Sequence, residues 1–287
     1  EKADLASATS SWSTKLIHGG LRYLEFYEFS LVRKSLQERE VLTAAAAHII
    51  KPIAFHIPQL PHSRSSWLIR VGLFLYDNLA RRKRFGGSRS IKIDPEGPLS
   101  SAITRGFEYW DAQVDDSRLV VLNVLQAKRR GAQILTRTEC TGMKSLDNGW
   151  RVTLHDHASN TDSEVDCKVI VNATGPWVAD LSEKLKNETA EHEIRLVKGS
   201  HIVVPRIHTG SKAFMLQHHD GRVIFVIPWL QDYTLIGTTE AEHKGSLERV
   251  EISEEEISYL LSIVNLYFKK SILRSDIVYS FAGVRPL

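Results

Sequence analysis

The middle of the chain alternates between helix and strand patterns, and this alternation constrains the fold more than any other feature. Residues 115–117 (Asp-Asp-Ser) are a typical helix start, and Gly131 is suited to end the helix pattern of residues 118–130. Strand patterns follow at residues 133–138, 150–154 and 165–172, with a hairpin turn at 147–149. Strands separated by a helix predict a doubly wound α/β unit, in which residues 168–175 form a buried strand that leads into a turn of small residues.

The pattern changes from Ile194 onward. Short β-rich runs separated by turn residues predict an antiparallel sheet, with strands at residues 200–205, 213–216, 223–229 and 233–239. Residues 254–268 carry apolar side chains at helical spacing, which predicts an amphipathic helix whose apolar stripe packs in the core. Further elements are predicted at residues 30–47 (helix), 53–58 (strand, ended by Pro58) and 277–281 (strand).

Residues 10–23 gather hydroxyls, a lysine, a histidine, two adjacent glycines and an arginine in one short segment. Hydroxyls and a Gly-Gly pair allow the backbone to approach a polar ligand and to donate hydrogen bonds to it. His18 and Arg22 are four residues apart, so a helix through them would place both on one face. A proton acceptor beside a fixed cation suits the oxidation of an alcohol that also carries an anionic group. The alternative is a Ser-rich loop and a glycine turn with incidental polar residues.

Eight sequence blocks extend in order along the whole chain, at residues 8–24, 105–109, 114–119, 171–177, 197–205, 225–229, 236–239 and 283–287. Through these blocks the chain resembles the FAD-dependent glycerol-3-phosphate dehydrogenases, quinone-linked flavoproteins of the D-amino-acid-oxidase-like superfamily. One departure is visible, because residues 237–240 read Gly-Thr-Thr-Glu where the family has Gly-Thr-Thr-Asp. We expect the longer carboxylate of Glu240 to shift a local contact without changing the class of reaction.

The resemblance implies an α/β fold with an FAD-binding Rossmann-like (doubly wound) domain and an antiparallel-sheet substrate domain. The first domain would comprise residues 1–48 and 106–196, and the second, or cap, residues 49–105 and 197–287. The family opens with a strand and a glycine-rich phosphate turn, whereas this sequence starts at Glu1, which matches the carboxylate that holds the adenosine ribose. The chain is therefore expected to be an internal piece of a longer protein, and the piece alone to bind FAD poorly or not at all.

The activity that the resemblance implies is oxidation of sn-glycerol 3-phosphate at C2 to dihydroxyacetone phosphate, with hydride transfer to FAD and electrons passed to membrane quinone. One alternative is an oxidase of the same family that gives the electrons to dioxygen. A related amine or hydroxy-acid oxidase is disfavoured, because two arginines exceed what one carboxylate needs. The alternative of a different class is a non-catalytic fragment that binds a lipid surface.

Site residues follow from the same matches. For the substrate phosphate they are Arg22 and Arg285, with Tyr23 shaping the pocket, and the alternative for each arginine is an ordinary ion pair. For the hydroxyl proton the candidates are His18 and His201, because histidine titrates near neutrality. His18 is preferred and His201 supports it, with the order left open. The residues that match the family's cofactor contacts are Glu1, Thr9, Ser10, Ser11, Lys15, Leu16, Ala173, Thr174, Gly175 and Trp177.

Residues 67–80 combine aromatic and aliphatic side chains and are followed by the basic run Arg81 to Arg84. This composition suits a helix that lies in a membrane interface, with cations facing anionic lipid. The alternative is an ordinary core helix followed by a solvated basic turn. With the family's use of quinone, the first interpretation predicts a cytoplasmic protein held peripherally at the cytoplasmic membrane, or at the mitochondrial inner membrane in a eukaryote. The oligomeric state is open, with a homodimer as one option.

Composition excludes several other classes. The 37 Lys and Arg against 34 Asp and Glu give a net charge of +3, which makes no case for nucleic-acid binding. Cys140 and Cys167 fit neither a disulfide framework nor a common zinc pattern, and they favour a reducing compartment. The histidine pairs at 155–157 and 218–219 lack an identifiable third ligand, so no metal is expected. No signal peptide is evident, nor an apolar run of the roughly 18 residues that a membrane span needs.

Overall fold

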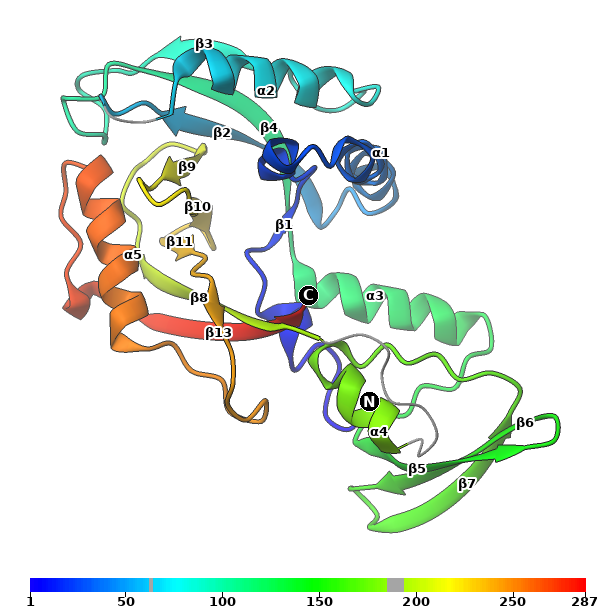
Figure 1. The fold of residues 1–287 in the computed structure, drawn as a ribbon. Coiled ribbons are helices and arrows are strands. Elements are labelled where there is room, and N and C mark those ends of the chain that lie inside the picture. Colours follow the sequence, from blue (N-terminus) through cyan, green and yellow to red (C-terminus); the bar gives the residue numbers. More distant parts are fainter. Residues whose placement is uncertain (62–63, 185–193) are drawn as a thin grey trace.

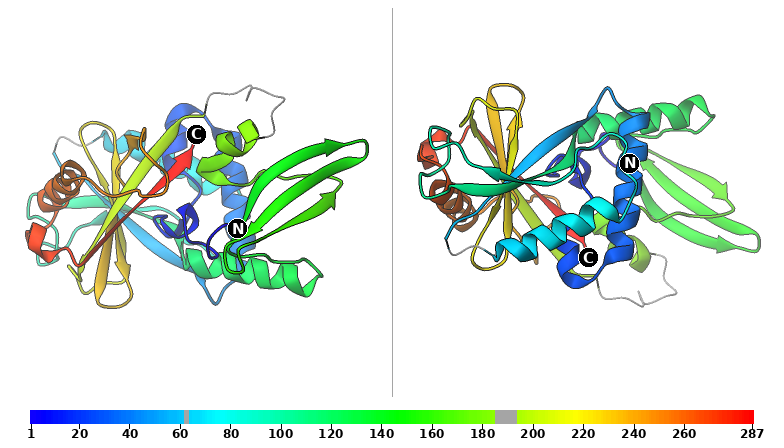
Figure 2. Two further views of the ribbon diagram at one scale, coloured as in Figure 1. Left: turned by 90° about the horizontal axis from the view of Figure 1, so that it is seen from below. Right: turned by 90° about the horizontal axis from the view of Figure 1, so that it is seen from above.

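The computed structural model describes residues 1–61, 64–184 and 194–287. It contains a ten-stranded mixed sheet and a separate three-stranded antiparallel sheet. Figure 2 shows the small sheet projecting to one side of the large one, with helix α3 beside it.

The large sheet has the strand order β1-β4-β2-β9-β10-β11-β8-β12, with β13 paired to β8 and β3 paired to β4. Its strands are β1 (Leu16–Ile17), β2 (Ile50–Pro58), β3 (Arg89–Lys92), β4 (Arg105–Val114), β8 (Leu196–Pro205), β9 (Ala213–Gln217), β10 (Val223–Trp229), β11 (Tyr233–Gly237), β12 (Ala241–Glu242) and β13 (Tyr279–Pro286). Only β2 and β9 pair in parallel among the described strands. The four predicted strands after Ile194 and the strand ending at Pro58 are therefore confirmed.

Helices cover both faces of the large sheet (Figure 1). They are α1 (Phe29–Ala45), α2 (Ser66–Asn78) and α5 (Glu254–Tyr267). Ile257, Leu260 and Val264 of α5 are buried in one apolar cluster with β8 to β11, which confirms the predicted core stripe. The buried apolar side chains of α1 and α2 belong to a second cluster with β2, β4 and Phe281 of β13. Among the described residues no helix combines the length and the apolar character needed to cross a bilayer.

The small sheet consists of β5 (Thr138–Leu146), β6 (Gly149–Asp156) and β7 (Thr161–Cys167), and the predicted hairpin turn joins β5 to β6. Helix α3 (Asp116–Arg129) begins as predicted, because the Asp115 carboxylate accepts a hydrogen bond from the Arg118 amide. The short helix α4 (Val178–Lys184) and the 3₁₀ turns η1 (Thr9–Ser11), η2 (Leu21–Phe26), η3 (Gly175–Trp177) and η4 (Arg274–Asp276) complete the described elements. The two-domain division stays a prediction.

Two predicted strands are wrong. Residues 133–137 form no strand, since 136–137 are a bend and Arg137 has a φ of 55°, and they hydrogen-bond to the first residues of the chain, as in the bond from the Arg137 amide to the Ala3 carbonyl at 2.9 Å. Residues 168–174 are not a buried strand either, since Val169 is 73 % and Val171 is 82 % exposed. A strand needs a neighbour for its backbone groups, and no described strand lies beside this segment. Local apolar patterning could not reveal that absence.

Candidate active site

The opening loop, residues 9–15, lies against the C-terminal strand β13. The Thr9 hydroxyl donates to the Val284 carbonyl at 2.6 Å, and the Trp12 ring packs on Phe281 with 5.5 Å between ring centres. Gly283 allows this approach, because a Cβ there would lie 2.7 Å from the Cβ of Trp12. The loop and the strand that carries Arg285 are therefore neighbours, although about 270 residues separate them in sequence.

Lys15 is buried and anchors this loop to the start of α3. Its ammonium group donates to the two carboxylate oxygens of Asp116 at 2.9 and 3.1 Å and to the Ser11 carbonyl at 2.9 Å. The Ser13 hydroxyl donates to the same carboxylate at 2.7 Å. Asp116 thus neutralises the lysine. The sequence analysis missed Asp116, because an acidic residue at a helix start is sufficiently explained by the helix itself.

His201 lies beneath the loop and is 2 % exposed. Its Nε2 is 3.0 Å from the Thr14 hydroxyl, and its ring stacks on Phe281 at 4.8 Å. Gly237 leaves room for the ring, since a Cβ there would lie 2.2 Å from it. Burial, followed by the positive charges of Lys15 and Arg285, lowers the pKa of His201 to about 3. The imidazole is therefore neutral at physiological pH, and its buried Nδ1 has no partner among the described residues.

His18, Arg22 and Tyr23 lie beyond β1, in a different setting. No helix runs through His18 and Arg22, because η2 begins only at Leu21 and His18 is exposed after the strand. The shared helical face is therefore not formed. Arg22 instead reaches the β11–β12 connection, where its guanidinium is 3.4 Å from the Glu240 carboxylate. Tyr23 is 46 % exposed.

Of the other predicted cofactor residues, those of turn η3 lie against β13. Turn η3 contacts β13, and Gly175 there has a φ of 57° with open space where a Cβ would stand. Such a turn exposes backbone that a ligand can approach closely. Glu1 is near this turn through its neighbour, since the Lys2 ammonium is 5.1 Å from the Trp177 ring. The remaining predicted residues are placed as follows: Ser10, Ala173 and Thr174 are exposed, and Leu16 is half-buried in β1.

The histidine pairs do not form metal sites in the described part of the chain, where no cluster of three or more potential ligands occurs. His155 and His157 pair with Asp162 and Glu139 at 2.7 and 3.2 Å. His218 pairs with Asp220 at 2.9 Å.

Comparison with known proteins identifies the family. A family model described as FAD dependent oxidoreductase (DAO) matches residues 1–287. The chain belongs to this family of FAD-dependent oxidoreductases. FAD is accordingly its cofactor, and the predicted α/β FAD-binding fold class is confirmed.

The curated relatives carry related names. The chain is 49 % identical over 290 residues to a glycerol-3-phosphate dehydrogenase from Pseudomonas aeruginosa and 48 % identical over 287 residues to an aerobic glycerol-3-phosphate dehydrogenase from Escherichia coli. It is also 49 % identical over 290 residues to a D-erythritol 1-phosphate dehydrogenase from Brucella abortus. Each match covers 100 % of this chain and 56, 57 and 58 % of the relative, so the chain spans just over half of their length. The resemblance drawn from the sequence blocks is confirmed.

Two solved structures share the fold. The glycerol-3-phosphate dehydrogenase from Bacillus halodurans, complexed with FAD, is 26 % identical and superposes with a TM-score of 0.76 over 100 % of this chain and 51 % of its own. An L-α-glycerophosphate oxidase from Mycoplasma pneumoniae with FAD bound, 18 % identical, has a TM-score of 0.74 over 100 % of this chain and 76 % of its own length, which shows the fold alone.

Proposed function

We propose that the whole protein oxidises sn-glycerol 3-phosphate at C2 to dihydroxyacetone phosphate and passes the electrons to membrane quinone. The observation that carries the proposal is the grouping of a neutral, buried His201 with Arg285 and the opening loop around one strand. The names of the relatives that align over the whole chain support the substrate class. FAD, when bound, accepts the hydride.

The residues of this chain would supply binding and proton transfer. An arginine fork gives paired, charge-assisted bonds to a phosphate, which suits Arg285 and Arg22. The imidazole of His201 is neutral and so can accept the hydroxyl proton as the hydride leaves, and the negative charge of a bound phosphate would raise its lowered pKa. The contacts favour His201 for this step over His18, because His201 shares its surroundings with Arg285 whereas His18 lies beyond β1. The earlier preference for His18 stays a prediction.

The test is flavin reduction in the full-length protein with bound FAD. Addition of glycerol 3-phosphate should bleach the flavin absorbance, and D-erythritol 1-phosphate should be compared with it, since a relative of equal identity bears that name. If only D-erythritol 1-phosphate bleaches the flavin, then that compound and not glycerol 3-phosphate is the substrate. If neither compound bleaches the flavin, the proposal is overturned. Turnover with a soluble quinone, compared with peroxide formation in air, distinguishes a dehydrogenase from an oxidase.

A membrane quinone acceptor would require a membrane-facing surface, and we propose helix α2 for this role. Its buried face carries Ile69, Leu73 and Tyr76, as an ordinary core helix would. Its outer face carries four exposed apolar side chains at helical spacing, Trp67, Leu68, Val71 and Phe74, which are 68, 49, 46 and 60 % exposed. The two sequence interpretations of this helix thus apply to its two faces. An exposed apolar stripe of this kind favours an interface with lipid.

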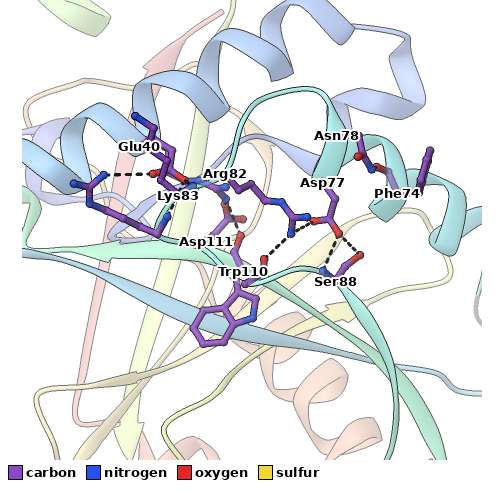
Figure 3. Close-up of polar contacts among 12 residues, drawn as sticks. Glu40, Phe74, Asp77, Asn78, Arg82, Lys83, Ser88, Trp110 and Asp111 are labelled. Carbon is purple, nitrogen blue, oxygen red and sulfur yellow. Dashed lines mark hydrogen bonds and ion pairs between the residues drawn. The ribbon is translucent and has the colours of Figure 1, made fainter.

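Arg81 and Arg82 of the basic run after α2, together with Arg33 of α1, line an open cleft of about 700 Å³. Figure 3 shows how the run is held: Arg82 pairs with Asp77 at 3.2 Å, and the Lys83 amide donates to Glu40 at 2.7 Å. The Arg81 and Lys83 side chains remain exposed beside the apolar stripe. Cations in this position suit anionic headgroups.

Flotation with anionic liposomes tests this surface in the full-length protein. We expect Arg81→Gln with Lys83→Gln to weaken binding in a salt-sensitive way. The matched control, Arg129→Gln with Arg130→Gln at the end of α3, removes the same exposed charge from another part of the molecule. Equal loss in both variants, or none in either, would contradict the assignment. Liposome binding without flavin uptake would favour the non-catalytic alternative.

A further inference from the structure

A buried hydrogen-bond chain ends on the glycine pair of the opening segment. The Gly19 amide donates to the Tyr76 hydroxyl at 2.7 Å and is 3.3 Å from the nearer carboxylate oxygen of Asp111. The Tyr76 hydroxyl in turn donates to that same oxygen at 2.7 Å. Tyr76 is on α2 and Asp111 is on β4, so two elements meet the segment between β1 and η2 at one backbone amide.

Asp111, at the acidic end of this series of hydrogen bonds, is itself held in place. Arg39 of α1 pairs with Asp111, and the two side chains are 2 and 3 % exposed. The Arg39 guanidinium also donates to the Trp110 carbonyl at 2.7 Å and stacks over Phe85 at 3.9 Å. Figure 3 shows Asp111 and Trp110 of β4 beside Glu40 of α1. A carboxylate held in this way cannot reorient cheaply, because moving it would leave a buried charge without its partner.

Gly19 fits its place tightly. A Cβ at this position would lie 2.3 Å from Leu36 and 2.6 Å from the Tyr76 oxygen. Burial and the nearby Asp111 raise the pKa of Tyr76 well above its usual value, so the hydroxyl stays protonated and can both accept from Gly19 and donate to Asp111. Gly20, with a φ of 75°, then starts the turn η2 that carries Arg22.

We propose that Tyr76 and Asp111 are positioning residues, which hold the Gly19 amide and thereby fix the turn that presents Arg22 to a phosphorylated substrate. Neither side chain touches the substrate in this scheme. Their effect passes through the backbone of a turn whose side chains are also held at the surface by the Arg22–Glu240 and Arg64–Glu25 pairs. The substrate part rests on the proposed function, whereas the restraint on the turn does not.

The experiment compares Tyr76→Phe with Tyr109→Phe in the full-length FAD-containing protein. Both side chains are buried in the same apolar cluster, with 6.0 Å between their ring centres, but the Tyr109 hydroxyl only contacts the Met215 sulfur at 3.5 Å. Two quantities are measured: hydrogen–deuterium exchange of a peptide covering residues 16–23 without substrate, and KM and kcat for glycerol 3-phosphate.

One buried hydrogen bond corresponds to about a tenfold change in an equilibrium. We therefore expect exchange of this peptide to be about tenfold faster in Tyr76→Phe, with KM raised by a similar factor and kcat changed less, because ground-state binding is what the turn supplies. Tyr109→Phe should show neither effect, and both variants should retain bound flavin.

Three results would overturn the inference: unchanged exchange in Tyr76→Phe, equal effects in both variants, or faster exchange with KM unaltered. If wild-type protein fails to oxidise glycerol 3-phosphate, the proposed function falls, while the exchange comparison still decides whether Tyr76 restrains the turn.

Discussion

The buried pair of Lys15 and Asp116 gives a quantitative prediction. Both side chains are almost inaccessible, at 11 and 10 %, and the carboxylate accepts from the Lys15 ammonium, from the Ser13 hydroxyl and from the Ser117 amide at 2.9 Å. Asp116→Asn keeps the shape of the side chain but removes its charge. Among the described residues, Lys15 then retains the Ser11 carbonyl and the rings of Trp229 and Phe281, but no carboxylate neutralises its buried positive charge.

Removing one member of a buried pair costs about 3 kcal/mol or somewhat more, because the remaining charge stays desolvated. We expect Asp116→Asn to lower the free energy of unfolding of the full-length protein by about that amount, measured by urea denaturation. Adding Lys15→Met should recover part of the loss, since the double variant buries no charge.

Glu254→Gln is the control for this prediction. It breaks the Arg274–Glu254 pair, whose side chains are 56 and 71 % exposed, and exposed pairs contribute little. A loss in Asp116→Asn no larger than in this control would refute the reasoning. So would a double variant less stable than Asp116→Asn alone.

Three further predictions concern the site. The pKa of His201 is about 3 in the folded protein and near 6.5 in the unfolded chain, so between these pH values the unfolded chain binds one more proton. The free energy of unfolding should therefore fall by about 1.4 kcal/mol per pH unit as the pH drops from 6.5 towards 3. In His201→Gln, the slope of this free energy against pH, measured by urea denaturation, should be smaller by the contribution of about one proton. Gly237→Ala, which forces a Cβ against the His201 ring, should cost about 1–3 kcal/mol and reduce flavin reduction by substrate, whereas Gly72→Ala, in an open helical position, should not destabilise the protein. Gly175→Ala places an L side chain at a φ of 57° without a steric clash. We expect this backbone strain to cost about 1 kcal/mol and to weaken FAD retention, measured by equilibrium dialysis.

Local signals predicted the elements whose cause is local. The start of α3 depends on a cap between Asp115 and Arg118, and the core stripe of α5 repeats within one helix. The turn between β5 and β6 lies within three residues of sequence. In each case the interaction partners are close enough in sequence for spacing to reveal them.

Features that depend on distant partners could not be predicted in this way. Lys15 and Asp116 are 101 residues apart, and each has an ordinary local explanation. The same holds for Tyr76 and Gly19, which are 57 residues apart. The apolar run at 168–174 was misread because its local pattern is that of a buried strand, while its exposure depends on which neighbours the chain supplies.

The two arginines proposed to bind the phosphate differ in the backbone elements that carry them. Arg285 stands on β13, which is paired with β8 along its full length, from Tyr279 opposite Val203 to Pro286 opposite Leu196. Arg22 stands on a single 3₁₀ turn that contacts helices rather than a ladder of strands. Arg285 is therefore held by a continuous strand ladder, whereas the position of Arg22 depends on the buried hydrogen bonds at the Gly19 amide. We therefore expect changes that accommodate a longer polyol phosphate, whether evolved or engineered, to occur around Arg22 and η2 rather than on β13.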